Sequence, residues 1–195
     1  MIDCLNLARY FIIRAYEDGI EADLTNMKLQ KLLYYAQSLH LALYDEPFFQ
    51  EEIQAWRYGP VCPPAYRFYS EFEASQLPIP NKESLLQLPS DKQELLEEIW
   101  GYFGGYHAYG LSNMTHGEFP WKKARKGLLP EASSTEPILL EDMKAFGYQK
   151  LDLIERKHPA YELAMSEVLK DTLDSESSNR IKKGEVHDWL NSLLD

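Results

Sequence analysis

With 195 residues, of which 45% are hydrophobic, 13% aromatic and 26% charged, the chain has the composition of one soluble globular domain, with or without a tail, and not of a disordered protein. The formal net charge of −11 argues against a dedicated nucleic-acid surface, because phosphate binding requires clustered lysine and arginine side chains. Two cysteines are too few for a disulfide scaffold, and no run approaches the roughly 18 apolar residues of a membrane span.

The first residues predict a helix. Asp3 can cap it, Gly19 can end it, and apolar residues recur between them at helical spacing instead of forming the block of a signal peptide. The apolar stripe consists of Leu5, Ala8, Phe11, Ile12 and Ala15. Because neither a signal peptide nor a membrane span is indicated, we expect a cytoplasmic protein.

A second helix is predicted from Thr25 or Asn26, either of which can be its N-cap, to Pro47. Its apolar stripe is formed by Leu29, Leu32, Leu33, Ala36, Leu39 and Leu43. Lys28, Lys31 and Gln37 fall off this stripe, as polar residues of an amphipathic helix do. We expect the first two helices to pack as an antiparallel hairpin.

Aromatic and β-branched residues become frequent after the second helix. Their alternation predicts a short strand or hairpin around residues 48–58, which Gly59 and Pro60 close. The remaining apolar periodicity is helical. The predicted fold class is therefore mainly α, a compact helical domain with one short β element.

Further helices are expected along the rest of the chain, at residues 65–72, 90–103, 108–114, 121–126, 140–157 and after Pro159. Pro63 and Pro64 suit the first turn of the first of these, and Ser90 and Gln93 have the spacing of a capping box. Gly147 interrupts the apolar stripe of the helix at 140–157 and weakens that prediction in its middle.

The composition changes near residue 171. Residues 174–180 form a polar linker with nothing to bury. Beyond them, an amphipathic stretch of barely three turns contains Val186, Trp189, Leu190, Leu193 and Leu194. A helix so short is marginal alone, so it docks either on the domain or on a partner. We therefore divide the chain into a domain at 1–157 and a helical extension with a polar linker at 158–195.

Three blocks of sequence follow one another in a fixed order. They are LTNMKLQKLLYYAQ at 24–37, IQAWRYGPV at 53–61 and LSNMTHGEFPW at 111–121. Together they resemble the Panacea family, the SocA-like or phage-associated antitoxin domain of bacteria and their phages. Three ordered blocks are a more specific signal than one short motif. The resemblance extends over about residues 6–146.

The Panacea family is associated with toxin neutralisation, in some cases by adaptor-type delivery to a protease. The resemblance therefore implies a non-enzymatic antitoxin that binds a cognate toxin directly, with a cellular protease as a further partner in the adaptor alternative. The helix-turn-helix module that the family often carries has no obvious counterpart here, so we expect no direct nucleic-acid binding. A basic toxin would suit this acidic, tyrosine-rich chain.

The block around Trp56 has a structural and a functional interpretation. Trp56 and Tyr58 would bury large areas, Gly59 would adopt a positive φ, and Pro60 would fix the next one. Tryptophan, tyrosine and arginine also dominate protein interfaces, and strand alternation would leave Arg57 on the opposite face to meet a partner. We favour the structural role, although both roles can coexist.

The third block contains the one constellation that resembles a catalytic or metal site: His116 and Glu118, preceded by Thr115 and followed by Trp121. A His-x-Glu pair lacks the helical spacing of a zinc motif, and no cluster supplies further ligands. We favour a turn fixed by local hydrogen bonds and expect no catalytic residue, metal or cofactor. The alternative is a small hydrolase acting through His116 and Glu118.

Overall fold

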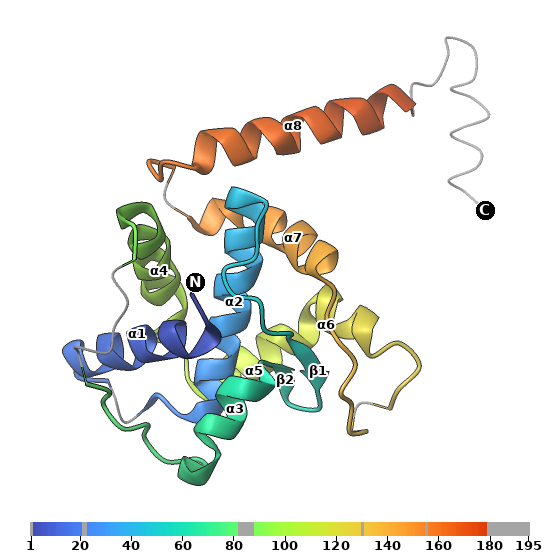
Figure 1. Cartoon of the computed structure of the whole chain (residues 1–195). Helices are drawn as coiled ribbons and strands as arrows, with labels where there is room; N and C mark the ends of the chain where they lie inside the picture. Colours follow the sequence, from blue (N-terminus) through green and yellow to red (C-terminus); the bar gives the residue numbers. More distant parts are fainter. Residues whose placement is uncertain (1, 21–22, 82–87, 130, 155, 179–195) are drawn as a thin grey trace.

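The computed structural model describes residues 2–20, 23–81, 88–129, 131–154 and 156–178. Helices dominate it, and one small antiparallel hairpin is the β element, which confirms the predicted fold class (Figure 1). Within the described ranges, no helix is both long and apolar enough to cross a bilayer. The elements are α1 (Cys4–Glu17), α2 (Asn26–Tyr44), β1 (Gln54–Trp56), β2 (Gly59–Val61), α3 (Pro63–Phe68), η2 (Ser70–Phe72), α4 (Ser90–Phe103), α5 (Ala108–Gly117), α6 (Phe119–Ala124), α7 (Leu140–Gln149), η4 (Leu151–Leu153) and α8 (Tyr161–Ser178).

Helix α1 begins where its sequence predicts. The Asp3 carboxylate accepts a hydrogen bond from the Asn6 N–H at 2.7 Å, which satisfies one of the unpaired donors of the first turn. Figure 1 shows α1 crossing α2, so the expected antiparallel hairpin of these two helices is wrong. The reason is that α2 is also packed by α4, α5 and α7, which leaves α1 only part of its surface.

Helix α2 lies at the centre of the molecule and is buried on all sides. Thr25 is its N-cap, and every residue from 28 to 43 is buried. Lys28, Lys31 and Gln37, which the sequence places off the apolar stripe, are therefore core residues. A helix surrounded by other elements has no solvent face on which to put them.

The buried polar side chains of α2 bind loop backbone. Lys28 Nζ donates to the Gly104 carbonyl at 2.5 Å. The Gln37 amide donates to the Phe49 carbonyl at 3.0 Å and accepts from the Phe48 N–H at 2.9 Å. Because buried polar groups must be hydrogen-bonded, these side chains fix the loops that would otherwise leave backbone groups unpaired.

The β element lies later in the chain than expected. Gln54 pairs with Val61 and Trp56 with Gly59, so Arg57 and Tyr58 form the turn. Gly59 and Pro60 belong to the second strand instead of closing the element, and Pro60 is tolerated there because β2 lies at the edge of a two-stranded sheet.

Helix α4 has no capping box. Pro89 occupies the N-cap and Ser90 is the first helical residue, while the Gln93 side chain donates to the Leu88 carbonyl at 2.7 Å. Helix α3 ends at Phe68 and is followed by the short helix η2, where a single helix over 65–72 was expected. The expected helix at 140–157 is divided in the same way, because α7 ends at Gln149 and η4 follows.

Helix α8 extends through Ser178, so the part of the expected linker from 174 to 178 is helical. This segment contains no glycine or proline, so no helix-stop signal ends α8 before Ser178. Ala160 and Ala164 bury this region against the core, whereas Leu163 and Leu169 are exposed. The amphipathic stretch from Val186 to Leu194 lies outside the described residues.

Candidate functional site

The three sequence blocks meet at the β hairpin. Its carbonyl groups accept hydrogen bonds from side chains of α2, α5 and the α6 region: Lys31 to Pro60 at 3.0 Å, Ser112 to Tyr58 at 3.0 Å, Trp121 to Trp56 at 2.8 Å and Arg125 to Ala55 at 3.1 Å. These four hydrogen bonds, which we call the carbonyl clamp, fix the hairpin backbone against α2, α5 and the α6 region. The blocks thus share a structural role that their separation in sequence conceals.

Thr115 and His116 lie within α5, not in a turn. The Thr115 hydroxyl donates to the Ser112 carbonyl at 2.8 Å, which is the local bond expected of it. His116 stacks on the Trp121 ring with 4.4 Å between the ring centroids. Burial, together with the nearby charge of Lys31, lowers the pKa of His116, so its imidazole is neutral at pH 7.

Glu118 is the N-cap residue of α6, and its carboxylate accepts a hydrogen bond from the Tyr35 hydroxyl at 3.0 Å. Burial raises the pKa of Glu118 to about 7, although the Tyr35 hydrogen bond acts in the opposite direction. In the described part of the chain, neither Nε2 of His116 nor Oε2 of Glu118 has a hydrogen-bond partner. Among the described residues, the Glu118 carboxylate accepts its hydrogen bond from Tyr35 and not from His116.

Gly59 makes the close approach between the hairpin and its supports possible. Its φ is +102°, as the sequence predicts, and a Cβ atom there would lie 2.6 Å from the Thr115 hydroxyl and 2.7 Å from Cε of Lys31. Both neighbours are themselves buried and cannot swing into solvent. The position therefore needs glycine for two reasons, backbone conformation and space.

Gly59→Ala is expected to destabilise the fold more than Gly127→Ala. Gly127 also has a positive φ, +88°, but a Cβ atom added there would have nothing within 4 Å, so this variant reports backbone strain alone, about 1–2 kcal/mol. Crowding at Gly59 adds about 1–3 kcal/mol. Urea unfolding of both variants measures the difference between their free energies of unfolding. Equal losses of stability would show that the carbonyl clamp accommodates the added methyl group at Gly59 without an energetic penalty.

The turn of the hairpin is exposed. Tyr58 is 53% exposed, Arg57 is exposed, and Trp56 is half-buried with its ring against Tyr66 at 4.9 Å between centroids. The expected burial of Tyr58 is wrong and that of Trp56 only partly right. The strand ends at Trp56, so alternation does not continue through the turn.

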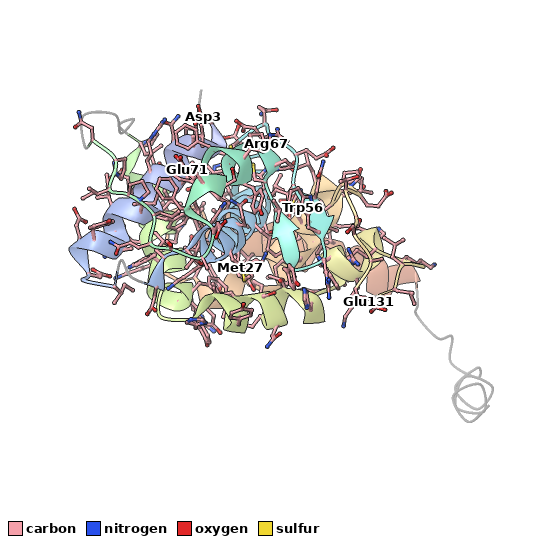
Figure 2. The ribbon with its side chains drawn as sticks, turned by 90° about the horizontal axis from the view of Figure 1, so that it is seen from below. Asp3, Met27, Trp56, Arg67, Glu71 and Glu131 are labelled. Carbon is pink, nitrogen blue, oxygen red and sulfur yellow. The ribbon has the colours of Figure 1, made fainter. Side chains whose placement is uncertain are left out.

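A cleft of about 790 Å³, the turn cleft, opens beside these residues. The first turns of α2 and α5, the hairpin, and Tyr66 of α3 line it. Figure 2 labels two of the lining residues, Met27 of α2 and Trp56 of β1. Tyr66 and Tyr109 also line the cleft; the sequence left its tyrosines open between core and binding face, because periodicity does not distinguish the two. Met27 lines the cleft as well and was not among the expected site residues.

Residues 29–122 match the family model described as antitoxin SocA-like, Panacea domain. A curated relative, antitoxin SocA of Caulobacter vibrioides (strain NA1000 / CB15N), is 37% identical over 52 residues, which are 27% of this chain and 28% of the relative. The chain thus matches little more than a quarter of that relative's length. No solved structure matches it. The family match spans all of the second and third blocks and most of the first, and it confirms the resemblance of this segment to the SocA-like Panacea domain.

Proposed function

We propose that the protein is an antitoxin that neutralises a cognate toxin by direct binding. The match of residues 29–122 to an antitoxin domain and the name of the Caulobacter relative support the antitoxin role. The observation that carries direct binding is the exposed hairpin turn, where tryptophan, arginine and tyrosine stand together beside a cleft. These residue types most often dominate the energy of protein interfaces.

The carbonyl clamp supports this role because it fixes the backbone beneath the turn. Association costs the entropy of every loop and side chain that becomes ordered on binding. Ser112 and Trp121 hold the carbonyls of Tyr58 and Trp56, two aromatic residues of the hairpin that line the cleft. A turn ordered before binding loses little further entropy. In this proposal the binding surface is stabilised from beneath by Thr115, His116, Glu118 and Trp121.

The partner we propose is a basic protein in the cytoplasm, and the neutralisation domain is residues 1–157. Acidic side chains of α4 line a second cleft of about 1010 Å³: Glu94 is exposed, and Glu97 is exposed but pairs with Arg14 at 3.0 Å. A basic surface of the toxin would find complementary charge there. This acidic cleft lies outside the turn cleft and would add contact area to it.

Tyr58→Ala and Trp56→Ala are expected to weaken toxin binding at least about tenfold, because truncated interface hot spots cost about 2 kcal/mol or more. The probe is the product of the neighbouring reading frame, co-expressed in a growth assay and then titrated calorimetrically. Leu163→Ala is the control, since Leu163 is 74% exposed on α8 and lines neither cleft. If both folded turn variants protect cells and bind as the parent does, the turn is not the neutralising surface.

A further inference from the structure

Two basic side chains at the turn cleft lack acidic partners among the described residues. Elsewhere in those residues Lys92 pairs with Glu46 at 3.0 Å, and Lys144 with Asp45 at 2.7 Å. Arg57 instead lies over the Tyr58 ring at 5.1 Å. Lys31, only 1% exposed, donates to the Pro60 carbonyl. No described carboxylate forms an ion pair with either of them, in a chain whose 31 acidic residues outnumber its 20 basic ones.

Two helix ends add to this positive character. Asn26 and Met27, which begin α2, and Ala108 and Tyr109, which begin α5, all line the turn cleft. A helix N-terminus carries a partial positive charge and N–H groups without intrahelical acceptors. Among the described lining residues Glu73 is the single acidic one. Arg57 and the two helix ends therefore give this cleft a positive character on a chain of net charge −11.

The walls of the turn cleft are largely apolar. Trp56, Tyr58, Tyr66 and Tyr109 present aromatic rings, and Met27 contributes a flexible thioether that adapts to the shape of what it contacts. A volume of about 790 Å³ is within the range of small-ligand pockets, so it accommodates a few residues of an extended chain. Positive charge and aromatic walls together favour a bound segment in which one negatively charged group is flanked by apolar side chains.

We propose that the turn cleft receives a short extended segment of the toxin in which an Asp or Glu carboxylate is flanked by apolar or aromatic residues. Arg57 pairs with this carboxylate at the rim, and the helix ends of α2 and α5 stabilise its negative charge. The flanking side chains pack on Trp56, Tyr66 and Tyr109. This inference rests on the proposed antitoxin function and adds the chemistry of the bound segment.

Charge reversal tests the proposal. The product of the neighbouring reading frame is the probe, together with overlapping 12-residue peptides of its sequence, titrated against the full-length chain at low and moderate salt. Arg57→Glu should weaken binding about a hundredfold and Arg57→Gln about tenfold, as expected for loss of an interfacial charge pair. Lys170→Glu makes the same charge change on exposed α8, which Figure 1 shows well away from the hairpin, and should bind within about twofold of the parent.

The bound peptide should contain Asp or Glu, its Asn or Gln form should bind at least about tenfold more weakly, and its Lys form should restore binding to the Arg57→Glu variant. If Trp56→Ala weakens the complex while Arg57→Glu does not, the proposal of an acidic segment in the cleft is wrong, whereas the proposal of neutralisation by direct binding is retained. If neither variant affects an observed complex, the cleft is not the toxin's site. If the parent protein forms no complex, the proposed function fails, and this inference fails with it.

Discussion

Gly147→Ala is expected to lower the free energy of unfolding by about 3 kcal/mol or more, at the upper end of overpacking effects. Gly147 lies on α7 where that helix contacts α2, and a Cβ atom there would be 2.1 Å from the Ser38 carbonyl oxygen and 2.8 Å from Cβ of Ala42. Neither neighbour is the flexible end of a side chain. The two helices would therefore have to separate along their whole contact, which exposes core residues such as Met143 and Phe146.

Gly101→Ala is the matched control for this change. Gly101 lies within α4, is exposed, and has nothing within 4 Å of the position of an added Cβ. Alanine favours a helix over glycine by about 1 kcal/mol, so this variant should be more stable than the parent. Urea unfolding followed by circular dichroism measures both variants. Stabilisation by Gly147→Ala as well would mean that α7 does not pack closely on α2.

Gly147 also shows why sequence periodicity misled at that position. A glycine on an apolar stripe weakens a helix by its intrinsic propensity, and the sequence carries no sign of a neighbouring helix that requires it. The start of α1 was predictable because Asp3 caps a donor only three residues away. Local signals thus placed helix starts well, whereas close contacts between distant segments were not visible in the sequence.

The side chains of α2 show the same limit. Lys28 binds the carbonyl of Gly104, 76 residues away, and Lys31 binds that of Pro60, 29 residues away. A periodicity argument assigns such residues to a solvent face because it contains no information about distant carbonyls. The three blocks correctly indicated that these segments belong together, but only the structure shows that their polar residues clamp a hairpin.

The candidate surface was half predictable. The sequence singled out Trp56 to Pro60 and left their structural and interface roles open together. Whether Tyr58 is buried depends on where the strand ends, and the Arg57 and Tyr58 turn lacks the Asn-Gly or Gly-rich signature that marks two-residue hairpins. Tyr66 and Tyr109 join the same cleft from α3 and α5, an arrangement set by tertiary packing.

Lys31 should make the stability of the protein increase with pH above neutrality. Burial lowers the pKa of Lys31 to about 7, whereas a lysine in the unfolded chain titrates near 10.4. Between these values the unfolded state binds a proton that the folded state does not. The free energy of unfolding therefore rises by up to about 1.4 kcal/mol per pH unit, or about 2–3 kcal/mol from pH 7 to pH 9.

Lys31→Met removes this proton linkage while keeping a long apolar side chain in the core, so its stability should change much less over the same pH range. Urea unfolding at pH 7.5, 8.5 and 9.5 avoids the main ionisation of Glu118, whose pKa is raised to about 7, and stays below the titration of unfolded tyrosines near pH 10. Lys170→Met, at an exposed site on α8, should follow the parent. Parallel curves for the parent and Lys31→Met would show that Lys31 keeps its proton in the folded state.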